Sequence, residues 1–495
     1  MRSFAASVTA VGVLCSWLCG GASAHGPTKR FYAVGFSSHR TLAAAVDGQG
    51  TVVRLVHAIR VAEVRSADRD FTARVRRSPG IRFVQLVRPR ESAIEPALVT
   101  PPGFATPFEW QFGVVHEELV PQSVLRAAAA VTIAIIDTGA DLTAPDLAAK
   151  QPRAYNLRLG NADVRDVNGH GTFVASLAAG SLTNGEGIAG FGGDAKLLIV
   201  KASRADGSLS DVDEANAIVY AVDHGARIIN LSVGGADTSL TERRGIQYAA
   251  DHGVLIVAAA GNEFEDGNPV EYPSALLQPV GSNGVGGVGL SVGASTQDGA
   301  RAFFSNTGSQ ISLVAPGDDV FGAVSSLSST DEYPRVALPG SSAGSYGFAS
   351  GTSFSAPEVA GVAALVMAAN PLLRSTEVAE ILKETASGGG AWNPEVGYGV
   401  VDAAAAVARA LGRGDLVVSG VRTRGHVRLR WFSPTAVRYQ ISVGVDRRPA
   451  RVVLANTSNT TATFTVRKGH LYVFTVIGLA ADGSQTTSST YAVRG

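Results

Sequence analysis

Hydrophobic residues follow different periodicities in different parts of the chain. Between about residues 108 and 411, short runs that are apolar throughout alternate with longer stretches of helical spacing. Strands buried on both faces read as continuous apolar runs, and their alternation with helices predicts an α/β fold, a mostly parallel sheet with helices on both faces. We interpret as strands the runs VTIAIID, KLLIVKA, ARIINLSVG, GVLIVAAAG and GLSVGAS.

The regions on either side of this α/β segment show other patterns. From Phe31 to about Pro89, strand-like runs flank helical stretches such as ADRDFTARVRRSPG, which predicts a small α+β unit. After Arg413, apolar and polar residues alternate, as in RYQISVGV and LYVFTVIGL. This alternation predicts an antiparallel β-sandwich of about 80 residues.

The N-terminal stretch has the pattern of a secretory signal peptide. It combines an early Arg2, an apolar run and the small residues ASA that end at Ala24. We therefore expect cleavage after Ala24 and a secreted, extracellular protein. Both cysteines, Cys15 and Cys19, lie in this segment, so the mature chain is expected to contain no disulfide. No later apolar run suggests a membrane anchor.

Length and charge narrow the function classes. The 495 residues are enough for two or three domains. Because 42 basic residues balance 42 acidic ones, no net field draws the chain to nucleic acid or to an anionic membrane surface. We expect no nucleic-acid partner.

Four short motifs in the α/β segment carry side chains able to do chemistry. IAIIDTGAD ends a buried strand at Asp137, and VAAAGNE ends another at Asn262. DVNGHGTFVAS brackets His170 with glycines, which let other backbone come close to the ring. GTSFSAPEVAG contains Ser353. Sites in such sheets lie at the carboxyl ends of the strands, so these side chains are candidates for one site.

Each motif taken singly also has a structural interpretation. An Asn after Gly is usually a turn residue, and a His before an apolar run can simply begin a helix. In the last motif, Ser355 and Glu358 match a capping box before an apolar helix. The chemical interpretation depends on the motifs occurring together.

As a set, the motifs resemble those of the subtilisin family of serine peptidases, whose chain order is Asp, His, Ser. The resemblance implies that Ser353 is the nucleophile, His170 the general base, and Asp137 the group that orients the ring. It also implies that Asn262 and the backbone N–H of Ser353 bind the oxyanion. No cofactor is then required for the chemistry, and we expect a serine endopeptidase that acts on protein or peptide substrates.

The resemblance also indicates where a substrate binds. Two edge strands would pair with an extended peptide by β-augmentation, and their residues are Ser208, Leu209, Ser232, Val233 and Gly234. Glu263 and Glu271 match positions at the base of the pocket for the side chain before the cut, so we expect a preference for Lys or Arg. The alternative leaves both glutamates as solvated loop residues. A compatible processing site follows Arg90.

The same resemblance suggests a domain organisation. Residues 1–24 form the signal peptide, 25–106 an inhibitor-like propeptide with its connector, 107–412 the catalytic domain, and 413–495 a fibronectin-III-like sandwich. The propeptide is expected to occupy the cleft as an intramolecular inhibitor, and the product to be a monomer. The alternative function is a catalytically idle relative that binds a surface or polymer through the sandwich.

Three further expectations concern metal, oxidation and the helix of the nucleophile. Asp146 and Asn184 match positions that contribute to a structural calcium site in many relatives, although both could be ordinary turn residues. Phe354 replaces a methionine that many relatives carry beside the nucleophile, which predicts resistance to peroxide. The helix is expected to begin near Ser353, with Pro357 in its first turn.

Overall fold

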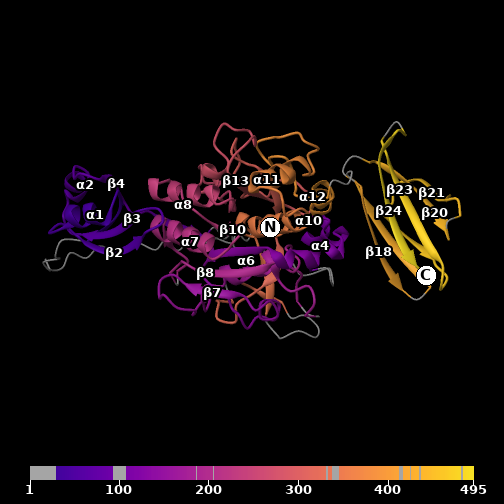
Figure 1. Cartoon of the computed structure of the whole chain (residues 1–495), viewed down its shortest axis with the longest axis horizontal. Coiled ribbons are helices and arrows are strands. Elements are labelled where there is room, and N and C mark those ends of the chain that lie inside the picture. Colours follow the sequence, from indigo (N-terminus) through magenta and orange to yellow (C-terminus); the bar gives the residue numbers. More distant parts are fainter. Residues whose placement is uncertain are drawn as a thin grey trace, which may run out of the picture.

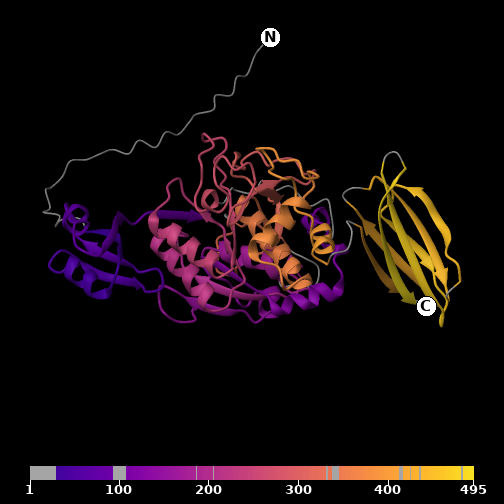
Figure 2. The same ribbon diagram turned by 45° about the horizontal axis from the view of Figure 1, so that its top comes forward.

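The computed structural model describes residues 29–92, 108–184, 187–204, 206–330, 333–336, 345–411, 416–423, 425–433, 436–446, 448–480 and 483–495. The predicted signal peptide and the connector between Ser92 and residue 108 lie outside the described residues. The described parts form an N-terminal unit, a large central unit and a C-terminal β unit, arranged in that order along the long axis (Figures 1 and 2).

The N-terminal unit is the predicted α+β structure. Its antiparallel sheet has the order β2-β3-β1-β4, formed by β1 (Arg30–Phe36), β2 (Thr51–Val56), β3 (Val61–Ser66) and β4 (Ile81–Leu86). Helices α1 (His39–Val46) and α2 (Phe71–Val75) pack on one face of the sheet. The other face packs through Ala33 and Phe83 against the central unit, on Val212 and Ala215.

The central unit contains the predicted parallel sheet. Its seven strands have the order β14-β13-β12-β10-β6-β8-β7, and every pair is parallel. The strands are β6 (Thr132–Asp137), β7 (Arg153–Asn156), β8 (Lys196–Lys201), β10 (Ile228–Leu231), β12 (Leu255–Ala259), β13 (Gly289–Ser295) and β14 (Leu313–Pro316).

Helices cover both faces of this sheet. One face is covered by α6 (His170–Ala179), α10 (Thr352–Ala369), α11 (Ser375–Glu384) and α12 (Ala403–Ala410), and the other by α7 (Asp211–Asp223) and α8 (Leu240–Asp251). Side chains of β6 alternate between the two cores, with Ile133 in one and Ala134 in the other. This arrangement confirms the predicted α/β fold.

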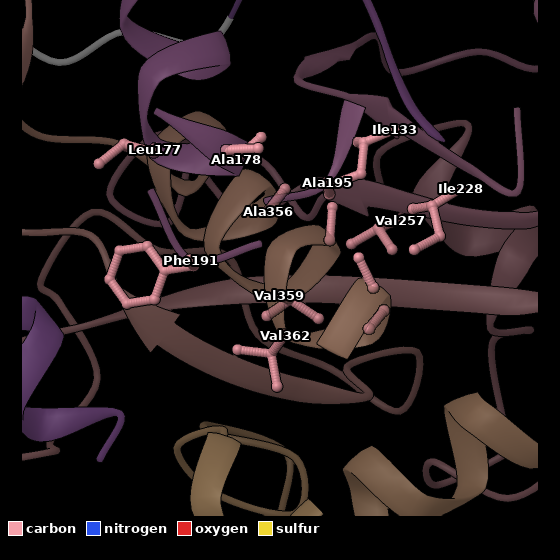
Figure 3. Close-up of a cluster of buried hydrophobic side chains, with 14 of the residues drawn as sticks. Ile133, Leu177, Ala178, Phe191, Ala195, Ile228, Val257, Ala356, Val359 and Val362 are labelled. Atoms are coloured by element: carbon pink, nitrogen blue, oxygen red, sulfur yellow. The ribbon is translucent and has the colours of Figure 1, made fainter. Parts of the chain in front are cut away.

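Helix α10 is the centre of the first core. Figure 3 shows Val359 and Val362 of this helix in the same buried apolar cluster as Val257 and Ile228 of the sheet. Among the described residues, only α10 is long and apolar enough to cross a bilayer, and 89% of it is buried inside the structure. Its apolar composition is therefore accounted for by its central position.

The C-terminal unit consists of two antiparallel sheets packed face to face. One has the order β18-β19-β22 and the other β21-β20-β23-β24. The strands are β18 (Val417–Thr423), β19 (His426–Phe432), β20 (Arg438–Val445), β21 (Arg451–Thr457), β22 (Thr461–Thr465), β23 (Leu471–Leu479) and β24 (Gln485–Arg494). Trp431, Ile441 and Phe474 are buried between them. This is a β-sandwich, as the alternation predicts.

The remaining elements are short. A three-stranded sheet, β11-β5-β9, links the N-terminal and central units, and its strands are β5 (Pro89–Ser92), β9 (Leu209–Ser210) and β11 (Val233–Gly234). A second small sheet contains β15 (Val320–Ala323), β16 (Arg335–Val336) and β17 (Tyr346–Ala349). The short helices are α3 (Trp110–Val114), η1 (Glu117–Leu119), α4 (Gln122–Ala127), η2 (Ala128–Ala130), α5 (Pro145–Ala148) and α9 (Ser274–Leu277).

Candidate active site

Asp137 and His170 meet at the carboxyl end of the sheet. Asp137 is the last residue of β6 and His170 the first of α6, and both are fully buried. Asp137 Oδ1 lies 2.8 Å from His170 Nδ1 and accepts a second hydrogen bond, of 2.7 Å, from the N–H of Thr138. A buried carboxylate needs such donors, and its acceptance of the Nδ1 proton leaves Nε2 able to act as a base.

Asp166, which sequence reasoning did not single out, holds this region together. Its Oδ1 accepts from Thr138 Oγ1 at 2.8 Å and from the N–H of Gly169 at 2.9 Å. Its Oδ2 accepts from the N–H and the Oγ1 of Thr172, at 2.8 and 2.6 Å. The buried carboxylate thus ties the turn after β6 to the start of α6. The only sequence signal was its place four residues before His170.

The glycines beside His170 permit close packing, as predicted. A Cβ on Gly171 would lie 2.3 Å from the carbonyl oxygen of Gly139 and 3.1 Å from Asp137 Oδ1. Gly169 adopts φ +103°, and a Cβ there would lie 2.6 Å from the Cβ of Ser328. Larger residues would force the histidine away from its carboxylate.

Ser353 lies at the start of the central helix. It is the second residue of α10, and its Oγ donates to the carbonyl oxygen of Ser232 at 3.2 Å. The ring of His170 lies 5.6 Å from that of the adjacent Phe354. Within the described part of the chain, His170 Nε2 has no hydrogen-bond partner. Rotation of the Ser353 hydroxyl away from Ser232 would therefore free it to donate to a nearby base.

Pro357 does not occupy the first turn of α10, so that prediction is wrong. Because the helix begins at Thr352, Pro357 is the sixth residue of the helix. A residue at this position would normally donate its N–H to the carbonyl of Ser353, but proline has no N–H. The Oγ of Ser232 donates to this carbonyl instead, at 2.7 Å. Ser355 is not a cap either, because its buried Oγ donates to the carbonyl of Pro316. The proline thus leaves an acceptor that anchors the nucleophile's backbone to the substrate strand.

Asn262 presents an unpaired amide nitrogen. Its Oδ1 accepts from both the N–H and the Oγ1 of Thr352, at 2.9 Å each. Thr352 Oγ1 also accepts from the N–H of Gly261 at 3.1 Å. With Oδ1 held in this way, Nδ2 is buried without a partner among the described residues. A buried donor without an acceptor is costly, and an oxyanion would supply one.

The predicted substrate strands carry a peptide segment of the chain itself. Strand β5 pairs antiparallel with both, through the residue pairs Ser92 with Val233, Glu91 with Gly234, and Arg90 with Leu209. The edge strands therefore accept an extended segment by β-augmentation. Ser208 directly precedes β9 and is half-buried, and its Oγ donates to Asp206 Oδ1 at 2.7 Å.

Glu263 and Glu271 lie together beside β11. A Cβ on Gly261 would be 2.8 Å from Glu263 Oε2 and 2.5 Å from Glu271 Cγ. Glu271 Oε2 also lies against Gly234, where a Cβ would be only 2.3 Å away. Glu263 Oε2 accepts from the N–H of Asn262 at 2.8 Å. The two glutamates are therefore not separate solvated loop residues. Arg90, the predicted processing residue, does not lie beside them.

Arg90 instead enters a different acidic site. Its guanidinium is 1% exposed, and it lies 3.2 Å from Glu214 Oε2 and 2.9 Å from Glu242 Oε1. Neither glutamate was singled out from the sequence, because they are 28 residues apart on α7 and α8. The register of β5 determines which pocket this arginine reaches.

Asp146 and Asn184 are neighbours, with Asn184 Nδ2 donating to Asp146 Oδ1 at 2.9 Å. Burial raises the pKa of Asp146 to about 6. The carboxyl of Glu109 is also near, and burial, with the charge of Asp146, raises its pKa to about 8. Within the described residues, no group of three His, Cys, Asp or Glu side chains forms a metal site. Asn184 faces Asp146 with its amide nitrogen, so calcium binding by Asp146 and Asn184 stays a prediction.

Comparisons with known proteins agree with this geometry. The family model of the subtilase family matches residues 128–399. The chain is 34% identical over 263 residues to the thermophilic serine proteinase of Bacillus sp. (strain AK1), covering 53% of this chain and 58% of that protein. It is also 34% identical over 276 residues to subtilisin Savinase of Lederbergia lenta, covering 56% of this chain and 90% of that protein.

The fold is also similar to solved structures. Fervidolysin from Fervidobacterium pennivorans, a keratinolytic enzyme related to subtilisin, aligns with a TM-score of 0.65 at 23% identity, covering 96% of this chain and 77% of that one. This likeness concerns the fold alone. The chain covers less than two thirds of the length of several sequence relatives, such as 58% of the Bacillus proteinase.

Proposed function

Because this chain belongs to the subtilase family, we propose that it is a serine endopeptidase that hydrolyses peptide bonds through an acyl-enzyme on Ser353. The observation that carries the proposal is the buried pair of His170 and Asp137, 2.8 Å apart, at the carboxyl end of the sheet. The unpaired Nδ2 of Asn262 supports it, because peptide hydrolysis develops a negative oxygen that needs a donor.

The reaction follows from the hydrogen-bonding roles of these groups. Ser353 Oγ attacks the scissile carbonyl while its proton passes to His170 Nε2. The oxyanion accepts hydrogen bonds from Asn262 Nδ2 and from the backbone N–H of Ser353, at the positive end of α10. His170 then gives its proton to the leaving amine. Water, deprotonated by the same ring, attacks the ester and releases the acid and free Ser353.

We expect the side chain before the cut to be Lys or Arg. Glu271 lies against Gly234 and, with Glu263, against Gly261, so a basic side chain there would meet carboxylates rather than an apolar surface. Matched peptides with Arg or Phe at this position test the expectation. A strong preference for Phe would contradict it without affecting the proposed catalytic residues.

The N-terminal unit is proposed to act as an inhibitory propeptide of a secreted precursor. The pairing of β5 with both edge strands supports this role, because a substrate needs the same strands. The signal-peptide pattern supports export of the precursor. N-terminal sequencing of the protein from culture medium tests both points, since a mature form that retains residues 29–92 would contradict processing.

A structural calcium ion is proposed near Asp146, with the amide oxygen of Asn184, turned toward the ion, and backbone carbonyls as further donors. The ion would stabilise the fold by neutralising buried carboxylates, and the chemistry would not use it. We expect a chelator to lower the melting temperature of the wild type. The same chelator should have little effect on Asp146→Asn, and an unchanged wild-type melting temperature would contradict the proposal.

Labelling by a fluorophosphonate tests the catalytic proposal. The probe should form a covalent adduct on Ser353, and the adduct should be absent from Ser353→Ala and strongly reduced in His170→Ala. Circular dichroism of both variants checks that they fold. A folded wild-type protein that neither reacts nor cleaves any peptide would favour the catalytically idle alternative.

A further inference from the structure

A second acidic pocket lies between the substrate strands and the helices behind them. It is formed by Glu214 of α7 and Glu242 of α8, both fully buried, and we refer to these two residues as the acidic pocket. Figure 1 shows the two helices side by side, next to the N-terminal unit. This pocket is separate from the position of Glu263 and Glu271.

The acidic pocket contains the side chain of Arg90, which reaches it from the docked strand β5. Arg90 Nε donates to Glu214 Oε2 at 3.2 Å, and Nη2 lies 2.9 Å from Glu242 Oε1. The arginine is one of the largest fully buried side chains of the described residues. An extended peptide between the substrate strands can therefore place a long cation completely inside the protein.

Electrostatics explain why an arginine occupies this place. Burial and the charge of Glu242 raise the pKa of Glu214 to about 8. The positive charge of Arg90 acts in the opposite direction, because it stabilises both ionised carboxylates. A neutral side chain would leave both buried carboxyl groups without a cation, so they would have to bind protons and would lack donors for their oxygens. The pocket is thus built for a planar cation with several N–H donors.

The register of β5 relates this pocket to the nucleophile. Ser92 pairs with Val233, so a substrate that continues this register places its next residue opposite Ser232. The carbonyl of Ser232 is 3.2 Å from Ser353 Oγ. The residue opposite Ser232 is therefore the one beside the scissile bond, and the residue in the acidic pocket lies three positions before it.

We propose that the acidic pocket is a specificity site for substrates, which selects peptides with arginine three residues before the residue whose carbonyl is cleaved. This inference rests on the proposed peptidase function and concerns a pocket other than the one beside Glu263. Since precursor and substrate use the same strands, the contact made by Arg90 is the contact that a substrate arginine makes.

Fluorogenic peptides based on RPRESAIEP, which begins at Arg88, test the proposal, and mass spectrometry of the products ensures that only cleavage after the residue corresponding to Ala93 is counted. One peptide keeps the arginine that corresponds to Arg90, and a second carries leucine there. The mature wild-type enzyme should cleave the arginine peptide with a kcat/KM at least about 100-fold higher, because leucine offers the buried carboxyl groups neither a positive charge nor N–H donors. Equal values for the two peptides would overturn the proposal, whatever the variants do.

Variants connect the preference to the acidic pocket. The double variant Glu214→Gln, Glu242→Gln should reduce the arginine-to-leucine ratio to less than about 10, because the neutral amides no longer offset a cation. Asp251→Asn is the matched control, since it removes one exposed carboxylate from α8 and should keep the wild-type ratio. A double variant that binds the fluorophosphonate and keeps the full ratio would refute the assignment.

The outcomes separate this inference from the function on which it rests. If the wild type reacts with the fluorophosphonate and cleaves both peptides equally well, the proposed peptidase function holds and the arginine site is refuted. If no peptide is cleaved and Ser353 does not react, the peptidase function itself fails.

Discussion

Thr352 holds Asn262 in position, and this role can be tested separately from catalysis by Asn262 itself. In Thr352→Val the N–H of residue 352 still bonds Asn262 Oδ1, but the second bond to that oxygen, of 2.9 Å, is lost. The buried N–H of Gly261 also loses its acceptor, which lies at 3.1 Å. The substitution preserves the shape of the side chain and removes only its hydroxyl.

The expected effect on turnover follows from that lost bond. A hydrogen bond contributes about 0.5–1.5 kcal/mol, so weaker orientation of Nδ2 should lower kcat about 2- to 13-fold. Complete removal of an oxyanion donor costs about 10²- to 10³-fold, a value established for a subtilisin and adopted here, which sets the upper limit. KM should change little, because Nδ2 acts on the transition state. The unpaired N–H of Gly261 should reduce the free energy of unfolding by about 1–3 kcal/mol.

The assay is steady-state hydrolysis of one chromogenic peptide, with active sites titrated by fluorophosphonate so that misfolded protein does not lower kcat. Thr352→Ser is the matched control, because it keeps the hydroxyl and should return kcat to near the wild-type value. The reasoning is refuted if Thr352→Val turns over like the wild type, or if Thr352→Ser loses as much activity as Thr352→Val.

Three other predictions concern packing, pH and oxidation. Gly171→Ala should lose activity and stability, because its Cβ would meet the Gly139 carbonyl oxygen at 2.3 Å. Gly225→Ala is the control: a Cβ there meets nothing within 4 Å, so it should lower the free energy of unfolding by only about 1–2 kcal/mol, through backbone strain, and keep kcat. Equal shifts in melting temperature for the two variants would contradict this. Burial lowers the pKa of His116, but the hydrogen bond to Asp402 and the charges of Asp402 and Glu118 together outweigh burial and raise the pKa. The pair therefore stabilises the fold fully below pH of about 6.5 and less as pH rises through the raised pKa. The melting temperature of His116→Gln should therefore fall further below that of the wild type at pH 5.5 than at pH 8.5, and a constant difference would count against the pair. Peroxide should leave the wild type active, because Phe354 is not oxidisable and Met367 is 2% exposed. Phe354→Met should be inactivated by the same treatment. Rapid loss of wild-type activity in peroxide would exclude this explanation.

Much of the fold could be predicted because its signals are local. Apolar runs such as VTIAIID are buried on both faces, and β6 indeed sends Ile133 into one core and Ala134 into the other. The alternation after Arg413 likewise became the strands of the sandwich. The start of α10 was predicted to within one residue, but Pro357 lies beyond the first turn. The helix tolerates it there because Ser232 Oγ donates to the Ser353 carbonyl that the proline cannot bond, a tertiary contact that no local pattern specifies.

In the site, too, local motifs could be predicted from the sequence and tertiary contacts could not. The four catalytic candidates could be found from the sequence because each occurs in a short Gly-rich motif whose residues are adjacent in the chain. The residues that position them could not, since Asp166, Thr352 and Ser232 act through hydrogen bonds that form only after the turns and strands are brought together. Thr352 lies inside GTSFSAPEVAG, but nothing in that motif indicates its bond to Asn262.

The sequence by itself determined the α/β order, the flanking units and the candidates Asp137, His170 and Ser353, because periodicity and motif spacing are properties of neighbouring residues. Only the tertiary structure decided that Arg90 meets Glu214 rather than Glu263. That outcome depends on the antiparallel register of β5 against two strands more than a hundred residues away. A shift by one residue would send each side chain to the opposite face, so register, which no local pattern records, decides what the groove can recognise.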